Sequence, residues 1–212
     1  APAIRRKPLF SGAQRGAALL VILAIIGLGA LYFLVSNLNR ATLAIGQAQK
    51  TSDALARAKE ALIGRAAADD NRPGSLPCPD TDNDGIAEIF AGTDCPSYIG
   101  RLPWRTLGLE DLRDSAGERL WYALSPNFRD HAAGGPLNSD TQGQLTVDGT
   151  ANIAAIILAP GSALLQQVRD AANQNNAANY LEGDNANGDT VYTAQTSDSL
   201  NDRLLAVAPV DI

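Results

Sequence analysis

The sequence predicts an α+β protein in which a long N-terminal helix packs on a small antiparallel β-sheet domain. An uncharged apolar run over residues 17–35 is followed by helical spacing up to residue 70. The remaining residues, 71–212, break into short apolar stretches bounded by Gly, Pro, Asn and Asp, a pattern typical of strands. With 45% hydrophobic and 19% charged residues, the composition is that of a globular protein.

The apolar run over residues 17–35 has the length of a membrane-spanning helix. At about 1.5 Å per helical residue it extends roughly 28 Å, close to the hydrocarbon thickness of a bilayer. Five basic residues and no acid occur in residues 1–40, so we expect the N-terminus on the cytoplasmic side. The alternatives are a buried core helix, which a small domain can rarely cover on every face, and a secretory signal cleaved near Ala44.

The helix is predicted to continue without a break into an amphipathic half over residues 36–70. No Pro occurs between Pro8 and Pro73, and apolar residues recur at roughly helical spacing through this half. Pro73 and Gly74 are then expected to end the helix. This continuity argues against a cleaved secretory signal, which would show a break in helical character after its apolar core.

The soluble part, 71–212, is predicted to contain several short elements. The expected strands cover 120–124, 145–147, 153–159, 190–194 and 204–208. Two short helices are expected over 106–114 and 162–172, the second with Ser162 as its N-cap. Trp104 and Trp121 are expected to anchor the core, since each lies among apolar residues.

Charge and motif content exclude several classes of function. The net charge is −6, and because residues 1–40 carry +5, the other 172 residues carry −11. Nucleic-acid binding is therefore not expected, since it needs clustered Lys and Arg. The chain has no nucleophile elbow, P-loop, HExxH or GxGxxG motif, so we expect no enzymatic activity. It also contains no Met, and we expect its precursor to begin further upstream.

The loop 78–95 is predicted to be closed by a disulfide between Cys78 and Cys95, the two cysteines of the chain. Within it, alternate acidic residues are spaced like the ligands of a calcium loop. The candidate ligands are Asp80, Asp82, Asp84, the Ile86 carbonyl and Glu88. The late bidentate Glu of an EF-hand is missing, because Ala91 stands at that spacing. A solvated Asp/Asn turn explains the same composition equally well.

A second polar loop, EGDNANGD, offers Asp184, Asn187 and Asp189 as a weaker candidate for a calcium site. Its spacing is irregular, so a plain turn is the favoured interpretation there.

The segment QRGAALLV resembles the processing site of the type IV pilin and pseudopilin family, and LPCPDTDNDG, IGRLPWRTLGLEDLRD and GERLWYALSPNF resemble bacterial prepilin-like proteins. The resemblance implies that residues 1–16 are a leader, which a prepilin peptidase removes after Gly16 before Ala17 is N-methylated. It implies a pilin-like fold, an inner-membrane helix with a periplasmic domain, and later packing against other subunits in a filament built by a membrane assembly platform. It also modestly favours structural calcium in the two loops.

One feature differs from the family pattern. Most pilins carry a Glu shortly after the cleavage point, where it pairs with a neighbour's amino terminus, but here that position is Val21, and no acid precedes Asp53. We therefore expect a minor pilin or a tip-type pseudopilin of a type IV pilus or of a type II secretion filament. The alternative is a repetitive subunit whose charge is balanced elsewhere. The rival hypothesis is a membrane-anchored calcium-binding or adhesive module in the periplasm that does not polymerise.

Overall fold

A computed structural model describes residues 15–164 and 166–212. Its first element is the predicted long helix, α1 (Arg15–Ala67), which runs through 53 residues without interruption. By length and composition α1 is able to cross a membrane. The chain divides into two compact units, Ala1–Gly46 and Gln47–Ile212, and the elements after Gly46 build one domain.

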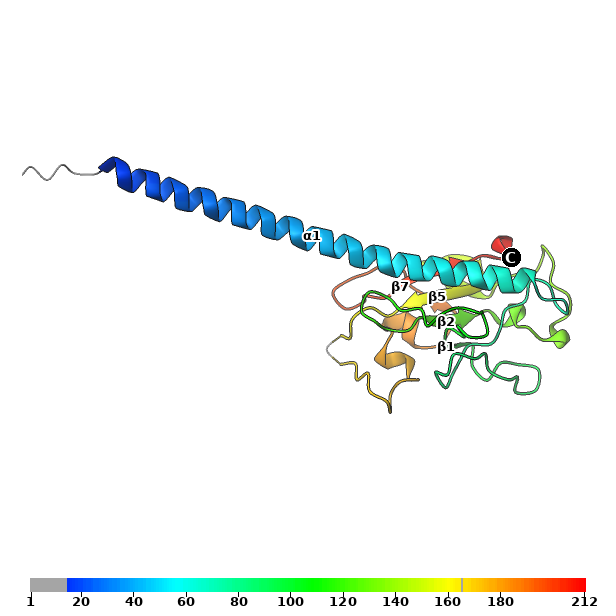
Figure 1. The fold of residues 1–212 in the computed structure, drawn as a ribbon. Coiled ribbons are helices and arrows are strands. Elements are labelled where there is room, and N and C mark those ends of the chain that lie inside the picture. The colour runs from blue at the N-terminus through cyan, green and yellow to red at the C-terminus, as the bar shows by residue number, and fades with distance from the viewer. Residues whose placement is uncertain (1–14, 165) are drawn as a thin grey trace, which may run out of the picture. The chain divides into compact units, whose positions relative to one another are not determined.

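The main sheet of this domain has four antiparallel strands in the order β1-β2-β5-β7 (Figure 1). The strands are β1 (Ile99–Arg101), β2 (Trp121–Leu124), β5 (Ala155–Ala159) and β7 (Arg203–Val207). The inner strands β2 and β5 are buried along their whole length. They are therefore uniformly apolar, whereas a half-exposed strand would alternate apolar and polar residues.

One face of the main sheet packs against the last part of α1 (Figure 1). Because side chains alternate between the two faces of a strand, Tyr122 and Leu124 point to this side, as do Ile157 and Val207. The helix contributes a single stripe of small and branched residues to the same core. These residues are Ala54, Leu55, Ala58, Leu62 and Ala66. The alanines bring the helix backbone close to the sheet, so the amphipathic half predicted from the sequence is confirmed in this domain.

The other face of the sheet carries a second core. Trp121, Ile156 and Leu158 pack there with Tyr180 and Leu181. Part of this layer is a three-stranded sheet in the order β4-β3-β6, in which β3 and β6 are parallel. Its strands are β3 (Leu145–Val147), β4 (Thr150–Ile153) and β6 (Val191–Tyr192). The domain is thus an α+β fold of three layers, with antiparallel pairing dominant.

Short 3₁₀ turns occupy several connections in the domain. They are η1 (Pro126–Phe128), η2 (Ala132–Gly134), η3 (Ala177–Asn179), η4 (Gly183–Ala186) and η5 (Pro209–Asp211). The chain leaves α1 through Asp69, whose carboxylate accepts hydrogen bonds from the backbone of Asn71 and Arg72. The buried Arg72 guanidinium then donates to carbonyl oxygens of residues 127–135, which fixes the connection that follows the helix.

Two predicted helices are wrong. Residues 106–114 form a turn followed by extended chain, because Gly108 adopts a left-handed φ of +67° and the backbone of Leu109 bonds back to Trp104. In the described part of 162–172 the chain is also irregular, because the carbonyl of Ser162 accepts the side-chain amide of Asn201 instead of a helical N–H.

The strand predictions need smaller corrections. The expected strand over 153–159 is two strands, β4 and β5, which meet at Ala154, and β1 was not predicted. Trp121 is a core residue as predicted, with 1% of its surface exposed. The prediction for Trp104 is wrong, because this ring is only partly buried and lies outside both cores. Arg105 and Arg119 flank it, with guanidinium carbons 4.9 and 5.9 Å from the ring centre.

Candidate functional site

The first candidate site is the apolar part of α1. From Leu19 to Ile45 its large hydrophobic side chains are exposed, each with more than half of its surface accessible. The hydroxyls of Ser36 and Thr42 donate to helix carbonyls four residues earlier, so these polar groups are satisfied within the helix. The uncharged stretch from Leu19 to Val35 therefore suits an apolar environment, whereas the exposed Arg40 follows it.

The predicted processing site lies at the beginning of the same helix. Gly16 and Ala17 follow Arg15, the residue at which α1 begins. Residues 1–14 of the predicted leader lie outside the described residues.

The predicted disulfide is confirmed. Cys78 and Cys95 are joined, with their Cα atoms 5.5 Å apart, and both are buried in the core beneath α1. The bridge therefore ties both ends of the acidic loop to the domain.

Asp80 organises the start of the acidic loop. Its side chain is 99% buried, and its two carboxylate oxygens accept hydrogen bonds from the backbone N–H groups of Asp82, Asn83 and Gly85. Burial raises the pKa of Asp80, and these three hydrogen bonds act in the opposite direction. Gly85 allows the turn as predicted, because it has a φ of +88° and a Cβ there would lie 2.5 Å from the indole nitrogen of Trp104.

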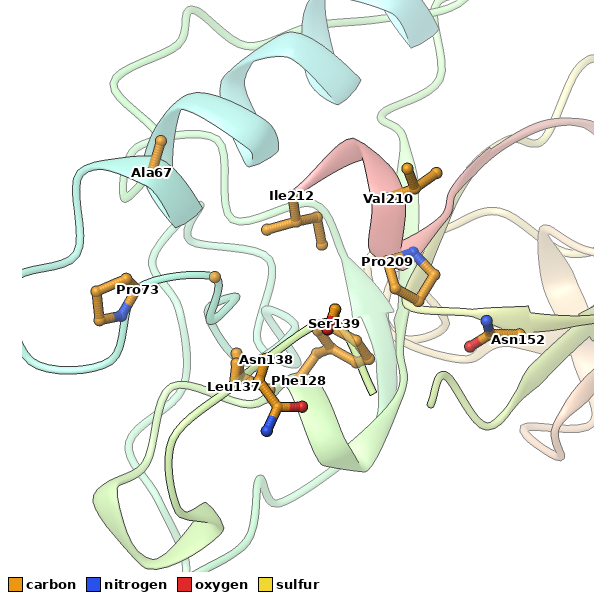
Figure 2. A pocket seen from close by; sticks show the side chains of 11 residues that line it. Ala67, Pro73, Phe128, Leu137, Asn138, Ser139, Asn152, Pro209, Val210 and Ile212 are labelled. Carbon is orange, nitrogen blue, oxygen red and sulfur yellow. The ribbon is translucent and has the colours of Figure 1, made fainter. Parts of the chain in front are cut away.

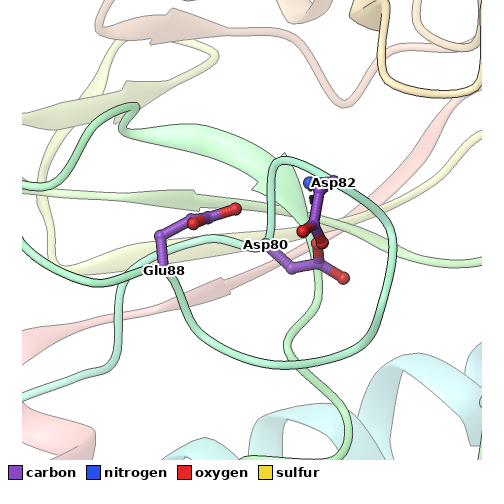
Figure 3. A group of neighbouring side chains, drawn as sticks. All are labelled: Asp80, Asp82 and Glu88. Carbon is purple, nitrogen blue, oxygen red and sulfur yellow. Dashed lines mark hydrogen bonds between the residues drawn. The ribbon is translucent and has the colours of Figure 1, made fainter.

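Three of the predicted calcium ligands converge. Asp80, Asp82 and Glu88, drawn in Figure 3, each place a carboxylate oxygen within 4.8 Å of the other two. Glu88 is held there by Thr81, whose backbone N–H and hydroxyl both donate to it. Asp84 is not part of this group, and its carboxylate accepts the backbone N–H of Ile86. The donor set consists of hard carboxylate oxygens, which are the ligands that Ca²⁺ prefers.

The second predicted loop forms local turns. Asn187 and Asp189 bond each other, and Asp189 also accepts the backbone N–H of Val191 at the start of β6. Asp184 lies exposed in η4 and shares no hydrogen bond with this pair in the described structure. The geometry agrees with the alternative of a plain turn.

Beside this loop the structure places a buried pair of acids that sequence analysis missed. Asp202 is fully buried, and one of its carboxylate oxygens accepts hydrogen bonds from the backbone of Glu182 and the side chain of Asn185. Its other oxygen has no hydrogen-bond donor among the described residues. Burial and the neighbouring Glu182 carboxylate raise the pKa of Asp202 to about 8. No local sequence motif predicts this pair, because Glu182 and Asp202 are 20 positions apart and come together only in the folded domain.

The raised pKa of Asp202 gives an expected pH dependence. The folded protein keeps a proton on this group up to about pH 8, whereas the unfolded chain loses it near pH 4. The free energy of unfolding should therefore fall as pH rises between these values, by at most about 1.4 kcal/mol per pH unit. In Asp202→Asn this contribution should be absent, so urea unfolding at several pH values should give a flatter profile. An unchanged slope would refute the assignment.

A cavity of about 530 Å³ lies near the end of α1 (Figure 2). Figure 2 shows Pro209 and Ile212 of the C-terminal segment opposite Pro73 and Leu137. Its lining is mostly apolar, with Asn138, Ser139 and Asn152 as the polar side chains.

No protein-family model, curated protein or solved structure matches the chain in comparisons with known proteins.

Proposed function

We propose that the protein is a minor pilin-like subunit, anchored in the bacterial inner membrane by α1 and later packed by the same helix into a type IV pilus or type II secretion filament. The observation that carries this proposal is the continuity of α1 from Arg15 to Ala67. Its earlier part exposes apolar side chains, whereas its later part is built into the domain core. No Pro or break separates the two uses of the helix.

The exposed side chains of α1 require an apolar environment. At about 25 cal/mol per Å² of apolar surface, exposing them to water would be strongly unfavourable, so lipid or other helices must cover them. The exposed apolar residues do not stop at Val35, the end of the predicted span, but recur at Leu38, Leu43 and Ile45. A surface longer than the span itself supports contacts with neighbouring helices in addition to contacts with lipid.

Assembly would then proceed in three steps. A prepilin peptidase cleaves after Gly16 and Ala17 is N-methylated, which removes the basic leader from the helix. The membrane stores the processed subunit through its apolar span, and an assembly platform moves the span into the filament. Close packing between helices must offset the loss of lipid contacts, since lipid and filament core are both apolar. The domain supplies lateral or tip contacts, and this role is structural rather than catalytic.

The absence of an early acid supports a minor position. An unpaired carboxylate in an apolar filament core is costly, so pairing with a neighbour's amino terminus is a requirement for a subunit that carries one. With Val21 at this position, the subunit cannot neutralise the amino terminus of a neighbour. A place at the tip of the filament, where a subunit has fewer neighbours, fits a subunit that cannot make this pair.

Photo-crosslinking from the span tests this proposal. A photoreactive residue at Leu28, which is 67% exposed, would be introduced into the full chain in cells that build filaments. In sheared filaments we expect adducts between Leu28 and the apolar helix of another subunit. The same group at Val191, on the domain surface, is the control and should give no adduct with such helices. A protein that never leaves the membrane fraction and forms only lipid adducts would be the non-polymerising anchored module.

We also propose that the loop of Asp80, Asp82 and Glu88 binds Ca²⁺, with water completing the coordination. A single carboxylate oxygen from each residue gives three of the six to eight ligands that Ca²⁺ takes. The role that the ion would have is structural: its two positive charges would offset repulsion among three acids held within 4.8 Å, and it would connect the start of the loop to Glu88. The disulfide already restrains both ends of this segment, so the ion would stiffen its middle.

Two matched substitutions separate the ligands of this site from the other acids in the loop. Asp82→Asn and Asp84→Asn each remove one charge, and each keeps the oxygen that accepts a backbone N–H. For the unaltered chain, Ca²⁺ at a hundred times its Kd should raise the free energy of unfolding by about 2.7 kcal/mol. We expect Asp82→Asn to lose most of this gain and Asp84→Asn to retain it, as measured by thermal unfolding with and without chelator. Equal responses of the two variants would contradict the assignment.

A further inference from the structure

A buried arginine lies on the second, apolar face of the main sheet. Arg101 is the last residue of β1 and stands directly opposite Trp121 of β2. Its side chain is 97% buried, and its guanidinium carbon lies 4.3 Å from the ring centre of Trp121 and 3.9 Å from that of Tyr180. The cation is thus placed between two aromatic rings, where cation–π attraction compensates part of its lost hydration.

The charge of Arg101 has no carboxylate partner within ion-pair distance in the described part of the chain. Its Nη groups donate to the carbonyls of Arg119 and Gln174, and its buried Nε–H has no acceptor among residues 15–164 and 166–212. Carbonyls of the described chain thus occupy two of its five N–H groups. Burial lowers the pKa of Arg101 to about 10. Buried charges are normally paired, so this arrangement lacks an anion.

Arg101 lines a cavity of about 360 Å³ together with three other arginines. These are Arg113, Arg119 and Arg169, and the acids in the lining are Glu118 and Asp170. Four positive and two negative side chains give the lining a net charge of +2, although residues 41–212 as a whole carry −11. The cavity therefore reverses the sign of the surrounding domain, which favours an anion as its occupant.

The hydrogen bonds of these arginines show which guanidinium groups are already used within the domain and which still have N–H groups available for a ligand. The guanidinium group of Arg169 donates hydrogen bonds within the domain, to Gly161, Gln167, Asn179 and Tyr180.

Arg119 is similarly occupied by Asp111 and Asn83. Among the residues that the structure describes, Arg113 donates to Gly117 and Asp111 alone, and its side chain is 44% exposed. Arg101 from the buried wall and Arg113 from the open rim are therefore the two guanidinium groups with several donors left.

We propose that this cavity binds a small oxyanion, a phosphate, sulfate or carboxylate group, which Arg101 and Arg113 hold by charge-assisted hydrogen bonds. Guanidinium forks match the geometry of such groups, and the volume lies at the lower end of small-ligand pockets. Arg119 and Arg169 contribute positive charge and fix the wall. Nothing in this proposal depends on filament assembly or on calcium.

Titration calorimetry of the full chain in uncharged detergent micelles tests the proposal, with inorganic phosphate, sulfate and acetate as probes at constant ionic strength. We expect saturable binding with one site per chain. The preferred probe identifies the class of ligand: phosphate or sulfate for a tetrahedral oxyanion, acetate for a carboxylate. In NMR spectra the indole N–H signal of Trp121 should shift along the same titration, because its ring contacts Arg101.

The decisive variant is Arg113→Gln, with Arg57→Gln as its matched control. Arg113 and Arg57 are both exposed, by 44% and 51%, and each forms one ion pair with a neighbouring acid. Loss of one charge-assisted contact should weaken binding by roughly tenfold in Arg113→Gln, whereas Arg57→Gln should bind as the unaltered chain does. The proposal is overturned if none of the probes binds saturably, or if both variants weaken binding equally.

Discussion

Leu62→Ala should lower the free energy of unfolding of the domain by about 2–5 kcal/mol, because it leaves a cavity in a close-packed core. Leu62 is completely buried in the stripe that joins α1 to the main sheet. The substitution removes contacts that no solvent molecule can replace. Urea unfolding followed by tryptophan fluorescence would measure the loss, since Trp121 lies in the core on the opposite face of the same sheet.

The same substitution at Leu38 is its control. Leu38 lies in the same helix but exposes 59% of its surface, so Leu38→Ala should change the unfolding of the domain by less than about 0.5 kcal/mol. If both variants lost the same stability, the separation of α1 into an exposed apolar part and a core-forming part would be wrong. If Leu38→Ala instead reduced incorporation into filaments, that result would support a packing role for the exposed part.

Replacing both Cys78 and Cys95 by Ala should cost about 3 kcal/mol, because closing a loop between residues 17 positions apart restricts the unfolded chain. Alanine is the appropriate replacement, because serine would bury two hydroxyl groups in the core. The melting temperature of the double variant, compared with that of the unaltered protein under oxidising conditions, measures this contribution.

The same double variant also tests the acidic loop. Because the disulfide restrains the segment that holds Asp80, Asp82 and Glu88, its removal should weaken calcium binding as well as stability. Reduction of the unaltered protein with dithiothreitol should reproduce both effects. Stability that is unaffected by reduction and by substitution would show that the loop is ordered without the bridge.

The sequence predicted the elements whose patterns are local. The apolar run and the absence of Pro predicted α1. Apolar stretches bounded by Gly, Asn and Asp predicted β2, β3, β6 and β7 to within one or two residues. The predicted helices over 106–114 and 162–172 failed for a different reason. In the first segment, the left-handed conformation of Gly108 determines the backbone path. In the second, a hydrogen bond from Asn201 to Ser162 determines it, and these two residues are 39 positions apart in the sequence.

The candidate sites likewise divide into those with a local sequence pattern and those formed by residues far apart in the sequence. Alternating acids located the candidate metal loop, but the spacing alone does not show which carboxylates converge, and in the fold Asp84 lies outside the group. The buried Asp202 and the arginine cavity have no local signal. Arg101 occurs as a single cation in an otherwise apolar strand, and only the packing of Trp121 and Tyr180 around it shows that it is buried.

The most direct measurement is the mass of the protein's N-terminal peptide, isolated from native membranes and from filaments. A pilin-like subunit should begin at Ala17 with a methylated amino group, and the same species should occur in both fractions. An intact leader, or a soluble form trimmed near Ala44, would show that the apolar part of α1 never enters a filament, and the proposed function would then be wrong.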